Sequence, residues 1–77
     1  MASLIVSYTD HRHDAAIMDH IIRIVDSCGK NEYDGPAYGP RDRVEMYFYG
    51  PESTVKKAVA EFKKVKAVKV KATYPSR

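Results

Sequence analysis

The sequence predicts an α+β fold with the element order βαββαβ, in which two helices pack on one face of a four-stranded antiparallel sheet. Three observations predict it: two stretches with apolar residues at helical spacing, three stretches that run apolar or alternate in polarity as strands do, and a glycine- and proline-rich stretch between them. The chain has 77 residues, 44% hydrophobic and 30% charged. This length and composition indicate one small globular domain, residues 1–77, and exclude an intrinsically disordered chain.

The first strand is predicted over residues 3–8. Its apolar run is only a few residues long and no basic segment precedes it, so it fits neither a signal peptide nor a membrane span. The single cysteine, Cys28, cannot form a disulfide within the chain, which is typical of a reducing compartment. We therefore expect a cytoplasmic protein that does not associate with membranes, in which Cys28 is a small buried apolar residue.

The first helix is predicted over residues 14–28, because apolar side chains recur there every three or four positions. These side chains are Ile17, Ile21, Ile24, Val25 and Cys28. Asp10 is a candidate cap before the helix. Gly29 follows directly after the helix, and glycine is the residue type that most readily takes the left-handed conformation that ends one.

A weak strand is predicted over residues 31–42, where Gly35, Pro36, Gly39 and Pro40 argue against a regular central strand. An edge strand tolerates these residues. The second strand of a βαββαβ fold does lie at an edge, with the spatial order 4-1-3-2. The segment 35–40 lacks the Gly-Lys-Ser/Thr ending of a phosphate-binding loop, so we interpret it as a stiff hairpin-like connector.

The second half of the chain repeats the pattern of strand, helix and strand. Residues 43–49 alternate between apolar positions that face the helices and polar or tyrosine positions that face outward. A helix follows over residues 53–65, with Pro51 suited to its first position and Ser53 as a candidate cap. Residues 68–74 form the last strand, in which lysine and threonine alternate with apolar residues. One face of the sheet is therefore expected to be exposed.

This order of elements is ferredoxin-like, and two segments carry a family resemblance. They are the Ser7-Tyr8-Thr9-Asp10-His11 turn into the first helix and the Val68-Lys69-Val70-Lys71 final strand. With these features the chain resembles ACT-type regulatory domains over nearly its whole length, a group that includes the metal-sensing half of nickel-responsive repressors. Those repressors carry histidines on the second strand, where this chain has Asn31, Glu32, Tyr33 and Asp34. The resemblance therefore does not extend to their metal site.

The resemblance implies a non-enzymatic regulatory module that needs no cofactor, senses a small-molecule effector and assembles by joining sheets. A homo-oligomer, dimer or tetramer, is also the general expectation for a domain of this size. The family binds effectors at the first strand-to-helix loop beside a neighbouring subunit. That placement implies a ligand site formed by Tyr8, Thr9, Asp10, His11 and His13. Because the chain shows no DNA-binding element, we expect it to regulate through a protein partner or as one subunit of a larger assembly.

A metal site at this loop is a further hypothesis, because His11 and His13 are flanked by Asp10 and Asp14. Imidazole and carboxylate groups together suit zinc, nickel or copper. The same residues also arise in a solvated loop whose acids complement the helix dipole. His20 lies about two helical turns beyond His13, or ~10 Å, which is too far to share one ion. We therefore predict no metal site, and His11 and His13 are the candidates if one exists.

The alternative function is binding of single-stranded RNA or DNA. RNA-recognition modules share this topology and stack bases on aromatic residues of the central strands, with lysines and arginines nearby for phosphates. The corresponding residues here are Arg43, Tyr47, Tyr49, Lys69 and Lys71. Against this alternative, Glu45 would share the face, and a sheet-to-sheet interface explains the two tyrosines as well. Catalysis is not predicted, because no nucleophile, base or carboxylate pair recurs at a spacing that brings them together.

Overall fold

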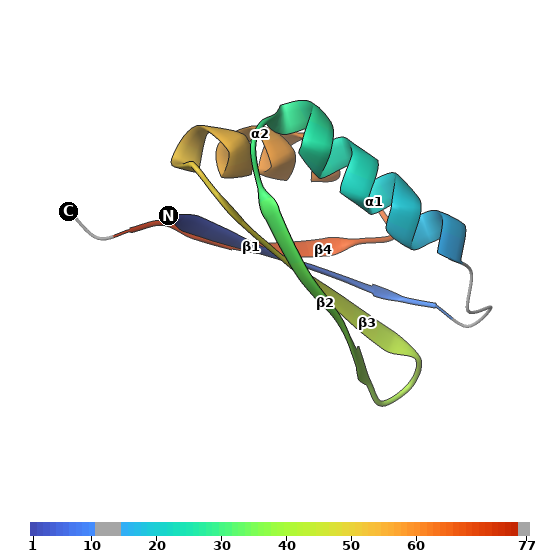
Figure 1. Ribbon diagram of the computed structural model, residues 1–77. Helices are drawn as coiled ribbons and strands as arrows, with labels where there is room; N and C mark the ends of the chain where they lie inside the picture. The colour runs from blue at the N-terminus through green and yellow to red at the C-terminus, as the bar shows by residue number, and fades with distance from the viewer. Residues whose placement is uncertain (11–14, 76–77) are drawn as a thin grey trace.

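In a computed structural model of the chain, residues 1–10 and 15–75 are described. The six elements follow the predicted order, with both helices on one side of the sheet (Figure 1). The elements are β1 (Ala2–Thr9), α1 (Ala15–Cys28), β2 (Glu32–Gly39), β3 (Arg43–Gly50), α2 (Glu52–Phe62) and β4 (Lys69–Thr73). The ferredoxin-like α+β prediction is confirmed. None of the helices in these ranges has the length and apolar character that crossing a lipid bilayer requires.

The sheet has the order β2-β3-β1-β4, which confirms the predicted 4-1-3-2 arrangement. β1 pairs antiparallel with β3 along its whole length, from Ala2 opposite Gly50 to Thr9 opposite Arg43. It pairs with β4 on its other side, where Val6 lies opposite Val70. Since residues directly opposite each other point to the same face, this register fixes which side chains face the helices.

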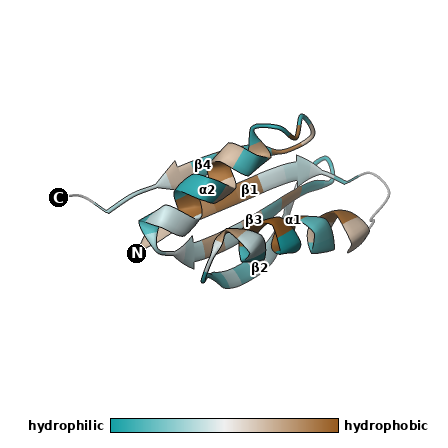
Figure 2. Ribbon diagram, turned by 90° about the horizontal axis from the view of Figure 1, so that it is seen from above, coloured by the Kyte–Doolittle hydropathy of each residue, from teal (hydrophilic) through white to brown (hydrophobic). Residues whose placement is uncertain are grey.

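The core lies between the helices and one face of the sheet. Every second residue of β1 and β3 is buried there, and the two helices lie side by side above them (Figure 2). The largest fully buried side chains are Leu4, Val6, Ile21, Val25, Met46, Phe48 and Phe62. Each such side chain contributes roughly 1.5–3 kcal/mol by leaving water. Cys28 belongs to this core and its thiol contacts the Ile24 carbonyl oxygen at 3.2 Å, which confirms the expectation of a buried cysteine.

Helix α1 ends at Cys28 as predicted. Gly29 has a positive φ of 144°, and a Cβ atom there would lie 2.5 Å from Oγ1 of Thr54 on α2. Glycine is thus required both by the backbone and by the close approach of the two helices. The predicted apolar stripe needs one correction, because Ile17 at its start is 37% exposed and lies beyond the buried part of the helix. Capping of α1 by Asp10 involves residues 11–14, which lie outside the described residues.

Helix α2 begins one residue earlier and ends three residues earlier than predicted. Pro51 takes the cap position with no side-chain hydrogen bond, so the prediction of Pro51 as the first helical residue and Ser53 as cap was wrong. The fixed φ of proline, here −58°, suits either position. At the other end, the amides of Lys64 and Val65 bond three residues back instead of four, which tightens the chain into a turn after Phe62.

Strand β2 runs further into the glycine- and proline-rich stretch than the connector interpretation allowed. The strand continues to Gly39, with an irregularity between Asp34 and Ala37 that contains the positive φ of Gly35, 115°. The turn that follows has φ of 60° at both Arg41 and Asp42. Positive φ at two central residues is typical of tight hairpin turns, because it matches the strand twist.

Candidate functional site

The sheet face opposite the helices carries polar and aromatic side chains, and we call it the open face. Its members follow from the strand register and from the alternation of burial along β1 and β3. They are Ser3, Ile5, Ser7 and Thr9 on β1, Arg43, Glu45, Tyr47 and Tyr49 on β3, Glu32 and Asp34 on β2, and Lys69, Lys71 and Thr73 on β4. The prediction of a basic and aromatic exposed face therefore holds, with acids added.

Charges of opposite sign lie at opposite edges of the open face. The edge strand β4 contributes Lys69 and Lys71, whereas the other edge strand, β2, contributes Glu32 and Asp34. Ile5 and Tyr47 lie side by side between them, because Ile5 pairs with both Lys71 and Tyr47. One row across the sheet thus reads Lys71, Ile5, Tyr47 and Asp34. A face of this kind is complementary to itself.

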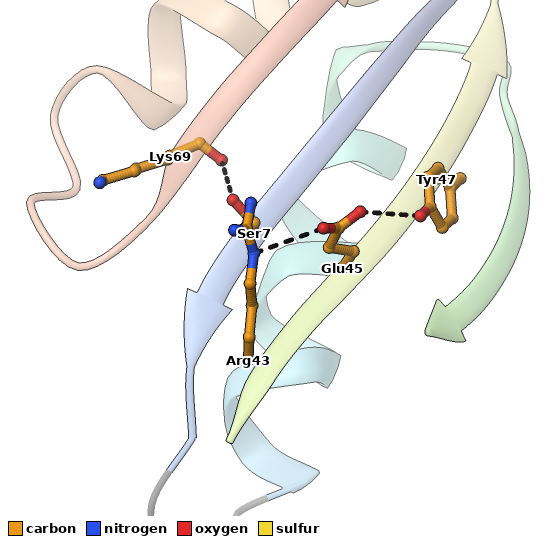
Figure 3. Close-up of polar contacts among 5 residues, drawn as sticks. All are labelled: Ser7, Arg43, Glu45, Tyr47 and Lys69. Carbon is orange, nitrogen blue, oxygen red and sulfur yellow. Dashed lines mark hydrogen bonds and ion pairs between the residues drawn. The ribbon is translucent and has the colours of Figure 1, made fainter. Parts of the chain in front are cut away.

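A chain of polar contacts crosses the middle of the open face (Figure 3). Arg43 Nε lies 3.3 Å from Glu45 Oε1, and the Tyr47 hydroxyl donates a hydrogen bond of 2.8 Å to Glu45 Oε2. The bond to this carboxylate is the main reason why the pKa of Tyr47 is raised above its ordinary value, and desolvation adds to it. Glu45 therefore holds an arginine and a tyrosine at fixed positions on the sheet.

A cavity of about 700 Å³ opens where the open face meets the β2–β3 turn, and we call it the hairpin pocket. It is lined by Ser7, Tyr8, Thr9, Gly39, Pro40, Arg41, Arg43, Glu45, Ala67 and Lys69. The cross-strand pairing places Ser7 between Glu45 and Lys69, and the Ser7 hydroxyl makes a long contact of 3.5 Å to the Lys69 carbonyl oxygen. Three cationic side chains and one carboxylate thus surround this volume.

The described residues of the predicted ligand site lie at two different cavities. Tyr8 and Thr9 line the hairpin pocket, while Asp10 lines a smaller cavity of about 330 Å³ at the same hairpin, together with Tyr38. The Asp10 amide donates to the Asp42 carbonyl oxygen at 2.9 Å, so the end of β1 is tied to the hairpin turn. The predicted residues His11 and His13 lie outside the described residues, and their role stays a prediction.

Two buried tyrosine hydroxyls lie on the helix side of the sheet. Tyr8 is 5% exposed, and its hydroxyl, like that of Tyr33, has no hydrogen-bond partner among the residues that the structure describes. Burial is the main reason why the pKa of both groups is raised, and Asp10 adds to the effect at Tyr8. The Tyr33 ring packs on Phe48 with its centroid 5.1 Å away. Tyr8 is therefore mainly a core residue, and Thr9 is the exposed member of the predicted pair.

The residues predicted for nucleic-acid binding do lie together. Arg43, Tyr47, Tyr49, Lys69 and Lys71 all belong to the open face, as the strand alternation predicted. The sequence interpretation considered only one acid on this face, Glu45, but Glu32 and Asp34 lie there as well. These carboxylates repel the phosphates of a nucleic acid and so weaken the case for nucleic-acid binding. The metal prediction is not tested, because its candidates His11 and His13 lie outside the described residues. Within residues 1–10 and 15–75, no group of three His, Cys, Asp or Glu that could hold an ion occurs.

Sequence reasoning missed Ser7, Arg41 and Glu45 as pocket residues. Ser7 and Glu45 stand opposite each other only because of the β1–β3 register, which no single-strand pattern fixes. Arg41 was assigned to the end of the weak strand predicted over residues 31–42, whereas the turn at residues 40–42 places it beside Arg43. The detectable signal was the pair of arginines that flanks Asp42 directly after a Gly-Pro step.

No family model matches the chain, and no curated protein matches it. Solved structures do match. A PII-like signalling protein of Thermus thermophilus is 11% identical with a TM-score of 0.72, covering 94% of this chain and 82% of that one. The de novo designed protein Foldit4 is 15% identical with a TM-score of 0.59, covering 97% and 96%. A protein of Agrobacterium tumefaciens is 15% identical with a TM-score of 0.50, covering 100% and 95%. At these identities the matches establish the ferredoxin-like fold alone.

Proposed function

We propose that this chain is a non-enzymatic, cytoplasmic regulatory module of ACT-like shape, which senses a small effector, associates with a second copy through its open face and acts on a protein partner. The similarity in fold to a PII-like signalling protein supports a regulatory module. The observation that carries the proposal is the distribution of charge on the open face. Basic residues line one edge, acidic residues line the other, and Ile5 lies between them beside tyrosine.

The geometry of the face selects one way of stacking two copies. A two-fold axis parallel to the strands, between β1 and β3, turns the sheet over so that the β4 edge of one copy covers the β2 edge of the other. Each cross-strand row of one copy then lies directly over the same row of the second copy. Lys71 of one copy meets Asp34 of the second copy, and Ile5 meets Tyr47. Two sheets that pack face to face in this way keep their strands within about 30° of each other.

The edge charges cannot satisfy one another within a single copy. Lys71 and Asp34 are separated by two strands, and three strand spacings of about 4.8 Å place them roughly 14 Å apart. At that distance, which exceeds a Debye length, exposed charges are largely screened. In the stack, Lys71 of each copy lies against Asp34 of the other, so the two-fold axis gives this contact twice. Association is therefore the arrangement in which these charges contribute.

The centre of the face supplies apolar area for the same contact. Ile5 is half-buried in the isolated chain, and Tyr49 is 38% exposed. The Tyr47 hydroxyl already has a partner in Glu45, so covering this tyrosine leaves no polar group unsatisfied. Tyrosine is enriched at protein interfaces, and here Ile5, Tyr47 and Tyr49 share the centre of the face with the Arg43–Glu45 pair.

Charge reversal with rescue tests this proposal. Lys71→Asp and Asp34→Lys should each weaken self-association about tenfold, since each places two pairs of like charges in contact. The double variant Lys71→Asp/Asp34→Lys should restore it. Sedimentation equilibrium measures the association constants, and Lys57→Asp on the exposed side of α2 is the matched control that should change nothing.

The proposal is wrong if the unaltered chain is a monomer at all accessible concentrations, or if the double variant is as weak as the single ones. A monomer that binds a short mixed-sequence RNA at low salt would favour the alternative function instead. In that case Tyr47→Ala with Tyr49→Ala should lower RNA affinity, because base stacking on aromatic side chains contributes about 1–3 kcal/mol per base.

A further inference from the structure

The hairpin pocket combines a volume suited to a small molecule with an excess of positive charge. Its 700 Å³ falls in the range of ligand sites in proteins. Arg41, Arg43 and Lys69 line it against a single acid, Glu45, which leaves two positive charges in excess. The four groups come from three different segments, namely the hairpin turn, the start of β3 and the start of β4.

Among the described residues, Glu45 is the one acid that lines the hairpin pocket, while Asp10 and Asp42 line the smaller cavity beside it. Glu45 is engaged by Arg43 at 3.3 Å, whereas the structure pairs neither Arg41 nor Lys69 with an acid within residues 1–10 and 15–75. Like charges gathered around one cavity repel one another, and an anion between them removes that repulsion. Two arginines can each present parallel N–H donors to the oxygens of one anion.

We propose that the hairpin pocket binds the phosphate group of a small organic molecule. A phosphate monoester carries about −1.5 to −2 charges at neutral pH, which matches the excess of two positive charges in the pocket. The Ser7 hydroxyl, whose contact of 3.5 Å to Lys69 is long, is a further donor on the same wall. Pro40 and Ala67 offer apolar surface to the rest of the ligand.

This inference rests on the proposed function, because it names the chemical class of the effector, and it adds a consequence for association. The two-fold stack described above keeps each cross-strand row in place, so the pockets of both copies lie at the same end of the assembly. Their excess charges then face one another. A bound phosphate removes this repulsion and should strengthen association, and by linkage association should strengthen phosphate binding.

The binding step is tested on the full-length chain with inorganic phosphate as the probe, titrated against sodium chloride at constant ionic strength. Amide chemical shifts should move at residues 7–9, 39–45 and 67–69. Arg41→Gln and Lys69→Gln should each lower phosphate affinity about tenfold, as expected for the loss of one charge-assisted contact. The matched control Lys66→Gln removes an exposed lysine that does not line the pocket, and it should leave the affinity unchanged.

The outcome separates this inference from the proposed function. A glycerol phosphate titration that shifts the same amides shows that the monoester is accepted, and rejection of the monoester would overturn the assignment of an organic ligand. Phosphate shifts spread over the lysines of α2, or an affinity unchanged in Arg41→Gln, would also overturn it. A dimer that ignores phosphate contradicts only the inference, whereas a monomer with a phosphate-occupied pocket contradicts only the association.

Discussion

Replacing Tyr8 by phenylalanine should stabilise the protein. The Tyr8 side chain is 5% exposed and its hydroxyl has no hydrogen-bond partner among the described residues. Leaving a buried polar group unsatisfied costs about 1–3 kcal/mol, and Phe has the same shape without the hydroxyl. We therefore expect Tyr8→Phe to raise the free energy of unfolding by about 1 kcal/mol. In a domain of this size that corresponds to an increase of roughly 4–8 °C in the melting temperature.

Urea denaturation followed by far-ultraviolet circular dichroism measures this difference, with thermal melting as a second readout. Tyr38→Phe is the matched control, because it removes the same hydroxyl from a residue that is 72% exposed. The control should change stability by less than about 0.5 kcal/mol, as is usual for surface substitutions. A loss of stability in Tyr8→Phe would show that the hydroxyl is hydrogen-bonded in the folded protein, and it would refute this reasoning.

Two further predictions concern stability. Gly29→Ala should lower the free energy of unfolding by about 2 kcal/mol or more, because it strains a positive φ and sets a Cβ atom against Thr54. Adding Thr54→Ala should recover part of this loss when the two variants and the double variant are compared by denaturant unfolding. Fully additive effects of the two substitutions would contradict the contact between residues 29 and 54. The pKa values of Tyr8 and Tyr33 are raised above the ordinary 10.0 by burial, so the folded state favours the neutral phenols. The stability that comes from keeping these two phenols neutral is fully present below pH 10.0, and it is lost as the pH rises through their raised pKa values. Melting temperatures across alkaline pH should fall less steeply in Tyr8→Phe/Tyr33→Phe, and an identical slope would contradict the assignment.

The fold was predictable because each element carries its own local pattern. Alternation of apolar residues along the strand that contains Val44, Met46 and Phe48 gave its buried face directly, and the structure buries all three. The glycines and prolines of β2 pointed to an edge position, which is where the strand lies. The ends of α2 were less predictable. The tightening after Phe62 depends on how the chain returns to β4, which is a property of the tertiary structure and not of helical spacing.

The candidate site was less predictable because it depends on register. The residues of the open face follow from strand alternation, and their assignment from sequence was largely correct. Which of them are neighbours was not visible, since Ser7 meets Glu45 and Lys69 only through pairings between segments more than 35 residues apart in the chain. The acids of β2 were passed over for the same reason, because Glu32 and Asp34 reach the open face through their pairing opposite Tyr49 and Tyr47.

Cysteine cross-linking between copies tests the central claim most directly. Chains that carry Asp34→Cys are mixed with chains that carry Lys71→Cys and oxidised gently, and the covalent products are counted by gel electrophoresis and mass spectrometry. The proposed two-fold stack predicts a mixed dimer as the main product, because these positions meet only across copies, while either variant alone stays largely uncross-linked. Equal cross-linking within each variant alone, or none in the mixture, would contradict face-to-face association of the open face.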